Sequence, residues 1–323
     1  MIEGIFKYKQ QHINILCSTD NNYAPYCGVM LTSLLENNKQ YSIDIYILAS
    51  DISSINRRRF EILEERYDCS IRFVAPDNEL LSKCPIKDGD HVSMAAYYRI
   101  ICDRLLPNHV KRILYLDCDI IVNTDILKLY CMNIDGSSVV AACTDSYDPI
   151  HRERLGLTNN YFCSGVMLFD MKKFREGNYG QKCLDAINEN PDKFIYHDQD
   201  VLNIVLNNHV AFISPKWNMM SAFLRRDKSD MHMPETFKAE IEQTLLTESD
   251  KLIVHYEYLP KPWQKWVMMP HPFTKLWYHY RSISLWPDAP INCKVPFGFK
   301  FNVILLRIMW ILGMKKHPDY YLV

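Results

Sequence analysis

Glycine is scarce in this chain, with 10 residues among 323, and neither G-x-G-x-x-G nor G-x-x-x-x-G-K-[ST] occurs in it. Those glycine-rich loops bring backbone amides close to phosphate in dinucleotide-binding and P-loop proteins. A bound phosphate would therefore have to be held here in a different way. The small share of glycine and the lack of a repeated period also exclude collagen-like and low-complexity chains.

An excess of charge of one sign is also missing, because 37 Lys and Arg balance 38 Asp and Glu. The chain lacks the basic surplus that is typical of nucleic-acid-binding proteins, so we expect no nucleic-acid partner. The charge is unevenly placed, however, since residues 260–323 hold nine basic and two acidic residues and five of the six tryptophans. A basic, aromatic segment is typical of a surface that contacts anionic lipid.

Signals for export and for membrane insertion are not found either. The first residues, MIEGIFKYKQQ, contain no apolar stretch of a secretory signal, and the longest apolar run, 303–314, is shorter than the roughly 20 residues that span a bilayer. The eleven cysteines form no C-x-x-C pair and predict reduced thiols. We expect a cytoplasmic protein, with peripheral attachment to the inner face of the plasma membrane as a further expectation.

Short β-rich runs alternate with helical patterns between residues 12 and 140, which predicts βαβ units and the α/β fold class. Little periodicity marks residues 214–250, where we expect loops and a short helix. In open α/β sheets the ligand lies at the carboxyl ends of the strands. The other expected elements are strands at 13–18, 43–48, 70–74, 112–116, 139–143 and 162–169, and helices at 24–36, 53–67, 93–105 and within 189–207.

Two carboxylates, Asp117 and Asp119, directly follow the apolar strand that ends in Leu-Tyr-Leu. Two oxygen ligands at one strand end suit a hard divalent cation, which would in turn neutralise a diphosphate. Asp-x-Asp is common by itself, so a solvated acidic turn is the alternative. The position after a buried strand favours the metal site.

Two more polar clusters lie further along the chain. The run Tyr196–Asp200 precedes an apolar helix, and helix capping explains Asp200 alone. Asp198 and Gln199 exceed what a cap needs and are candidates for binding a hydroxyl-rich ligand. His255 could complete the coordination of a cation, and Lys261 could supply charge to phosphate. An ordinary core or surface histidine is the alternative for His255.

Six motifs, taken together in their order and spacing, resemble those of glycosyltransferase family 8, retaining enzymes that include bacterial lipooligosaccharide galactosyltransferases and glycogenin. The motifs are STDNNY (18–23), AAYYR (95–99), LYLDCD (114–119), FCSGVMLFD (162–170), YHDQDVLN (196–203) and HYEYLPKPW (255–263). The resemblance implies a GT-A type, Rossmann-like nucleotide-sugar-binding domain over residues 1–263, with a central mixed, mainly parallel sheet. Residues 264–323 would form a small basic, aromatic C-terminal extension for membrane attachment, with a protein-interaction surface as the alternative.

The resemblance also implies roles for the matching residues. The metal ligands of Mn²⁺, for which Mg²⁺ is an alternative, would be Asp117, Asp119 and His255. The residues that bind the UDP part of the donor would be Asp20, Asn22, Tyr23, Asp117, Cys118 and Lys261, with Tyr23 stacked on uracil and Lys261 at the diphosphate. The catalytic residues at the donor sugar would be Arg99, Asp198 and Gln199. Tyr97 and His91 match the family less specifically.

Two departures from the family pattern concern specificity. Cys163-Ser164-Gly165 stands where many relatives have Asn-Ala-Gly, so an amide expected near donor and acceptor is missing. Tyr258 stands where a glycine would let the backbone approach phosphate. The specificity for sugar or acceptor is therefore open, and at Tyr258 either the loop is shifted or the phosphate contact differs.

The function expected from these observations is transfer of galactose or glucose from a UDP-sugar to a hydroxyl of a cell-surface saccharide such as lipopolysaccharide, with retention of anomeric configuration. Retention by double displacement through Asp198 or Gln199, and retention by a front-face reaction, are both open. The acceptor could be a saccharide, a glycolipid or a glycoprotein. A UDP-sugar-binding module without catalysis is the alternative from another class of protein.

Overall fold

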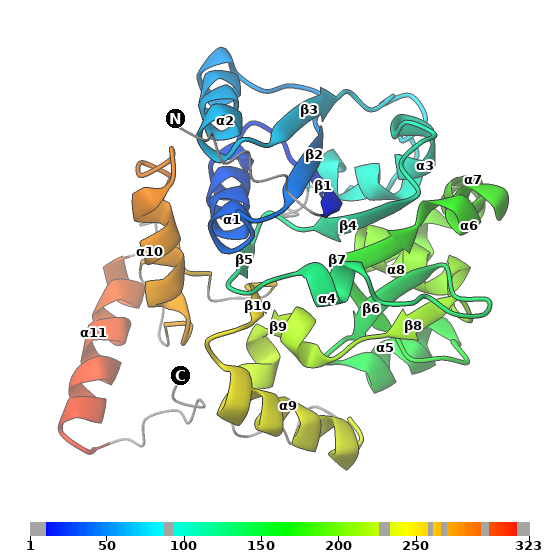
Figure 1. Ribbon diagram of the computed structural model, residues 1–323. Helices are drawn as coiled ribbons and strands as arrows, with labels where there is room; N and C mark the ends of the chain where they lie inside the picture. The colour runs from blue at the N-terminus through cyan, green and yellow to red at the C-terminus, as the bar shows by residue number, and fades with distance from the viewer. Residues whose placement is uncertain are drawn as a thin grey trace, which may run out of the picture.

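The computed structural model describes residues 11–86, 93–225, 233–257, 261–265, 270–291 and 297–314. Its strands are β1 (His12–Ser18), β2 (Ser42–Leu48), β3 (Ser70–Val74), β4 (Arg112–Leu116), β5 (Ile120–Val122), β6 (Val140–Thr144), β7 (Phe162–Asp170), β8 (Val210–Phe212), β9 (Met219–Met220) and β10 (Ile253–His255). They form a seven-stranded sheet in the order β3-β2-β1-β4-β7-β6-β8 and a three-stranded sheet in the order β5-β10-β9 (Figure 1).

The seven-stranded sheet is mixed and mainly parallel. β1 pairs in parallel with β2 and β4, β2 pairs in parallel with β3, and β6 does so with β8. Only β7 runs antiparallel to both of its neighbours, β4 and β6. The predicted α/β class and the mainly parallel sheet are confirmed.

Helices cover both faces of this sheet. The α-helices are α1 (Ala24–Asn37), α2 (Ser54–Tyr67), α3 (Cys102–Leu105), α4 (Leu127–Tyr130), α5 (Asp148–Leu155), α6 (Met171–Glu176), α7 (Tyr179–Glu189), α8 (His197–Val205), α9 (Glu235–Glu248), α10 (Thr274–Ile283) and α11 (Phe297–Ile311). The 3₁₀ helices are η1 (Met94–Ile101), η2 (Pro191–Lys193), η3 (Pro215–Trp217) and η4 (Ser221–Leu224).

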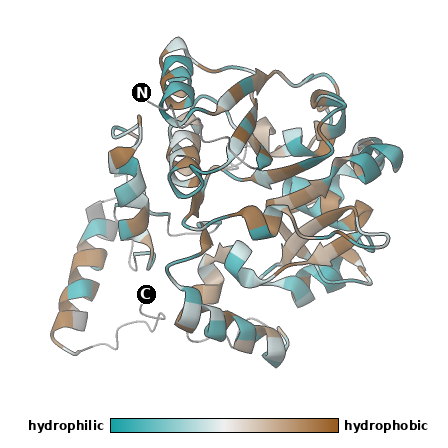
Figure 2. Ribbon diagram, in the orientation of Figure 1, coloured by the Kyte–Doolittle hydropathy of each residue, from teal (hydrophilic) through white to brown (hydrophobic). Residues whose placement is uncertain are grey.

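Alternation along the strands divides the interior into two cores. Ile15 of β1 packs with α1 and α2, whereas its neighbour Leu16 packs with η1, α7 and α8 on the opposite face. Successive side chains of a strand point to opposite faces, so a strand buried on both sides is apolar throughout. The hydrophobic colouring of the central strands in Figure 2 follows from this double burial.

Two predicted elements differ from the structure. The helix expected at 93–105 is the 3₁₀ helix η1 followed by the short α3, and η1 buries residues on several sides, including Tyr97, Arg99 and Ile101. The irregular region 214–250 contains α9, a helix of 14 residues and longer than the short helix expected. Because α9 buries only three residues, its sequence shows only a weak helical period, and the period does not indicate the full length of the helix.

Much of the aromatic C-terminal segment packs against α1 and α2. Trp277 and Trp286 are almost fully buried, and a side chain at Gly28 of α1 would overlap the Trp286 ring. The Trp286 indole donates to Asn56 of α2 at 2.9 Å. Figure 1 shows α11 at the periphery, beyond α10. Among the residues that the structure describes, no helix has the length and apolarity needed to cross a bilayer.

Candidate metal and sugar-nucleotide site

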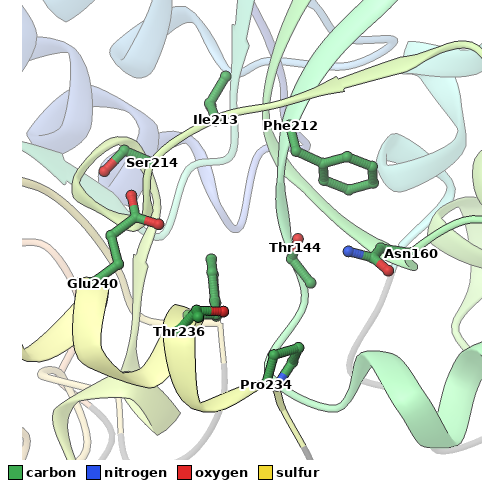
Figure 3. A pocket seen from close by; sticks show the side chains of 9 residues that line it. Thr144, Asn160, Phe212, Ile213, Ser214, Pro234, Thr236 and Glu240 are labelled. Carbon is green, nitrogen blue, oxygen red and sulfur yellow. The ribbon is translucent and has the colours of Figure 1, made fainter.

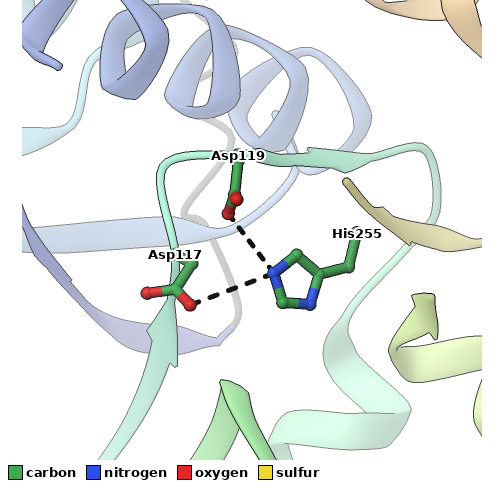
Figure 4. A group of neighbouring side chains, drawn as sticks. All are labelled: Asp117, Asp119 and His255. Atoms are coloured by element: carbon green, nitrogen blue, oxygen red, sulfur yellow. Dashed lines mark ion pairs between the residues drawn. The ribbon is translucent and has the colours of Figure 1, made fainter. Parts of the chain in front are cut away.

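Three side chains, at the ends of three strands, converge on one point (Figure 4). Asp117 follows β4, Asp119 precedes β5, and His255 ends β10, which pairs with β5 so that His255 lies opposite Ile120. His255 Nε2 lies 3.3 Å from Asp119 Oδ1 and 3.9 Å from Asp117 Oδ2. One ligand atom from each of the three residues lies within 4.8 Å of the other two.

Two further residues hold the His255 ring in place. Asn218 Oδ1 accepts a hydrogen bond from His255 Nδ1 at 2.9 Å, which leaves Nε2 directed at the carboxylates. Gly165 of β7 leaves room for the ring, because a Cβ atom at this position would lie 2.2 Å from His255 Cε1. Such an outer partner fixes the tautomer and orientation of a metal-binding histidine.

The electrostatics of this cluster favour a cation. Although burial opposes both effects, Asp119 raises the pKa of His255 well above its usual value, and Lys261 and His255 lower the pKa of Asp119. The field that attracts a proton to His255 also attracts a divalent cation to the same point. Two carboxylates and one imidazole are a donor set that Mn²⁺ accepts. The residues present therefore fit a divalent metal ion.

Lys261 places a positive charge at the edge of this cluster. Its Nζ lies 2.5 Å from Asp119 Oδ2 and also donates to the carbonyl oxygen of Tyr256. The side chain is largely buried, so its charge acts on the cluster with little screening by solvent. The structure thus brings Lys261 to the carboxylates, while Tyr258 in the same motif lies outside the described residues.

Arg99 joins the metal cluster to the residues predicted at the donor sugar. Its Nη2 lies 2.7 Å from Asp117 Oδ1, and its Nε lies 3.1 Å from Asp198 Oδ2. The guanidinium also packs over the ring of Tyr115, 4.1 Å from the ring centroid. Because both carboxylates are held by one buried guanidinium, Asp117 and Asp198 have a fixed separation. Burial raises the pKa of Asp198 to about 6, and Arg99 opposes that rise.

Gln199 is fixed at both ends of its amide. Its Oε1 accepts from the backbone amide of Ser164 at 2.9 Å, and its Nε2 donates to Asp145 Oδ2 at 3.3 Å. Asp145 is itself buried, and burial together with Glu257 raises its pKa to about 7. Asp145, Asp198 and Gln199 therefore form one polar wall beside the metal cluster.

The neighbouring Asp200 has a structural role, as the capping alternative predicts. Its carboxylate accepts from Arg154 and from the Tyr161 hydroxyl, each at 2.7 Å, and from the amides of Ile195 and Tyr196. Asp200 is fully buried and holds the turn that precedes α8. This turn presents Asp198 and Gln199 to the site.

The residues predicted to bind the nucleotide lie at the end of β1. Asp20 Oδ1 accepts from the Tyr23 amide at 2.9 Å and so shapes the turn into α1. Burial raises the pKa of the Tyr23 phenol, and the negative charge of Asp119 adds to that rise. The Cys118 thiol donates to the carbonyl oxygen of Ser18 at 3.1 Å and points into the core. Asn22 is exposed, and among the described residues its side chain makes no hydrogen bond to the others.

Three residues of this region were missed by the sequence reasoning. Asp145 directly follows β6, so the rule of polar residues at strand ends could have identified it. Gly165 stands within a named motif, but its closeness to His255 depends on the pairing of distant segments. Asn218 belongs to the region expected to be irregular, and nothing in its sequence context marks it. The predicted Tyr97 bonds to Pro85, and His91 lies outside the described residues.

Comparison with known proteins decides the family. The model of glycosyl transferase family 8 matches residues 14–267, most of the chain. The chain belongs to this family. General stress protein A of Bacillus subtilis is 31% identical over 86% of the chain and 96% of that protein. Lipopolysaccharide 1,2-glucosyltransferase of Escherichia coli K12 is 27% identical over 94% of the chain and 88% of that protein.

Solved structures agree on the fold of this family 8 chain. The galactosyltransferase LgtC, crystallised with donor and acceptor sugar analogs, superposes with a TM-score of 0.73 at 21% identity. The alignment covers 90% of this chain and 99% of LgtC. The GT-A fold predicted for the family is therefore confirmed, and the chain is a glycosyltransferase by family membership.

Proposed function

We propose that this family 8 chain transfers a hexosyl group, galactose or glucose, from a UDP-sugar to a hydroxyl of a lipopolysaccharide saccharide, with retention of configuration and with Mn²⁺ as cofactor. The observation that carries the proposal is the cluster of Asp117, Asp119 and His255, joined through Arg99 to Asp198. Two relatives support the acceptor class, since they are named as lipopolysaccharide 1,2-glucosyltransferase and 1,3-galactosyltransferase.

The residues divide into a nucleotide side and a sugar side. Asp117, Asp119 and His255 would hold the cation, which when bound offsets the negative charge that develops on the departing diphosphate. Lys261 adds a fixed positive charge beside it. Arg99 and Asp198 would bind hydroxyls of the donor sugar, because both are buried polar groups that border the cluster.

The hydrogen bonds of Asp198 and Gln199 favour a front-face reaction for retention. Gln199 Oε1 is occupied by the Ser164 amide, and Asp198 Oδ2 is occupied by Arg99. An oxygen that accepts from buried donors is a weaker nucleophile, since attack on carbon would forfeit those bonds. In a front-face reaction the leaving phosphate takes the proton of the acceptor hydroxyl, and both side chains only position the sugar.

We also propose that α11 attaches the enzyme to an anionic membrane surface, where a lipid-linked acceptor would be found. Its large apolar side chains are mostly exposed, among them Phe301, Ile304 and Ile311, whereas Val303 is buried. The sequence contains no acidic residue between Asp288 and Asp319. Apolar insertion combined with basic charge gives reversible attachment. Deleting residues 295–323 should abolish sedimentation with anionic liposomes while UDP-sugar hydrolysis remains. Equal sedimentation of both forms would contradict this attachment.

A panel of UDP-sugars tests the donor and the activity together. The purified chain is incubated with UDP-galactose, UDP-glucose and UDP-N-acetylglucosamine in Mn²⁺, and release of UDP is measured. Hydrolysis of one UDP-hexose above the others identifies the donor. Tight binding of UDP without hydrolysis or transfer for any donor would instead support a binding module.

A further inference from the structure

A concave surface lies where β6 and β8 end (Figure 3). This cavity of about 360 Å³ is bordered by the strand ends, by the loop before β7 and by the first turns of α9. Its volume falls within the roughly 300–1,000 Å³ of small-molecule sites. The residues that the argument uses are Thr144, Asn160, Phe212, Thr236, Phe237 and Glu240.

The polar side chains of this cavity have unused hydrogen-bonding capacity. Asn160 Oδ1 accepts from Arg152, but its Nδ2 donates to no group in the part of the chain that the structure describes. Within the same part, the hydroxyls of Thr144 and Thr236 and the carboxylate of Glu240 make no protein hydrogen bond. Thr144 is buried and Asn160 is half-buried, whereas Thr236 and Glu240 are exposed at the rim. These groups are available to water or to a ligand.

The composition of the cavity matches an uncharged sugar. Phe212 and Phe237 supply apolar surface against which the C–H face of a pyranose can pack, while the amide, hydroxyl and carboxylate groups suit its hydroxyls. Among the described residues no Lys, Arg or His lines the cavity, so the lining that the structure describes contains no charge that would neutralise a phosphorylated or acidic sugar. Glu240 would repel such a group.

Two segments that line the cavity lead directly into the polar wall. Thr144 is followed by Asp145, whose carboxylate accepts from Gln199. Asn160 is followed by Tyr161, whose hydroxyl bonds to Asp200 at the turn before α8. A ligand in the cavity would therefore border the two segments that lead into the wall of Asp145, Asp198 and Gln199.

We propose that this cavity binds an uncharged sugar residue of an oligosaccharide acceptor, at a position other than the residue that receives the hexose. The inference rests on the proposed transferase function and extends it. The enzyme then recognises at least two acceptor residues, and a monosaccharide is a poorer ligand than an oligosaccharide.

The test measures oligosaccharide affinity in variants of the cavity. The probe is a dephosphorylated core oligosaccharide released from lipopolysaccharide, titrated into the full-length protein with UDP and Mn²⁺ present. Phe212→Ala and Glu240→Ala should each weaken binding about five- to tenfold, the size expected for one lost contact. Glu240→Gln, which keeps the acceptor oxygen, should retain most of the affinity.

Controls separate this inference from the proposed function. Gln243→Ala, on an exposed position of α9 outside the cavity, should leave oligosaccharide affinity unchanged, and all variants should keep the wild-type affinity for UDP. Unchanged oligosaccharide affinity in both cavity variants, or no binding by the wild type, would overturn the inference. If UDP-sugar hydrolysis persists in that case, the transferase proposal stands, whereas absence of hydrolysis with every donor would refute the transferase proposal itself.

Discussion

A methyl group at Gly165 should disable the metal site without touching any proposed ligand. The added Cβ would lie 2.2 Å from Cε1 and 2.8 Å from Nδ1 of His255. Carbon atoms normally approach to about 3.5–4.0 Å, so the ring would have to move by about 1 Å or more. Metal–ligand distances tolerate only about ±0.2 Å. We expect Gly165→Ala to lose the His255 ligand and the bond from Nδ1 to Asn218.

The expected loss of Mn²⁺ affinity is at least about 10- to 100-fold, the usual effect of disturbing a partner of a metal-binding histidine. Mn²⁺ binding is measured by electron paramagnetic resonance of the free ion in the presence of UDP. His255→Ala provides the matched background, since removing the ring makes room for the methyl group. In that background Gly165→Ala should cost little further affinity. Wild-type Mn²⁺ affinity in Gly165→Ala would refute the placement of His255 at the metal.

Replacing Asp198 or Gln199 by alanine should lower kcat for transfer and leave UDP affinity unchanged, because both side chains are proposed to face the sugar. UDP affinity is measured by calorimetry, and a parallel loss of it would refute this placement. Tyr23→Ala should do the reverse and weaken UDP binding, through loss of a stacking surface. Burial raises the pKa of Asp145 to about 7, above an unfolded value of about 4, so ionisation disfavours the folded state and stability falls as pH rises through this window. The loss of unfolding free energy across this window is on the order of 4 kcal/mol. Asp145→Asn should remove this loss, which is measured by urea titrations at pH 4 and pH 8. An unchanged pH dependence in the variant would contradict the assignment of the raised pKa to Asp145.

Most strands of the large sheet, and the two carboxylates of the cluster, could be predicted because their signals are local. β1 to β4 are short β-rich runs separated by helical patterns, and Asp117 and Asp119 follow the apolar end of β4 directly. The directions of the strands depend on pairing between distant segments. The antiparallel β7, for example, has the same apolar sequence that a parallel strand would have, so its direction could not be predicted.

For the C-terminal tryptophans, the composition of the segment predicted a lipid-contacting surface, but two of these side chains are buried in the protein. Trp277 and Trp286 are buried against α1 and α2, and the small residue Gly28 that admits Trp286 lies more than 250 positions away in the sequence. Apolar and basic character alone cannot distinguish a lipid-facing segment from one that packs on its own domain. In the described residues, the exposed apolar side chains of this region are concentrated on α11.

Dependence of donor hydrolysis on the metal cluster tests the central claim most directly. The rate of UDP release from the preferred UDP-hexose is measured in EDTA and in Mn²⁺ for the wild type, Asp119→Asn and His255→Ala. The account predicts that EDTA abolishes hydrolysis, that Mn²⁺ restores it, and that each substitution lowers the Mn²⁺-dependent rate by about 100-fold or more, equivalent to several kcal/mol of transition-state stabilisation. Equal rates in EDTA and in Mn²⁺, or full activity in both variants, would contradict it.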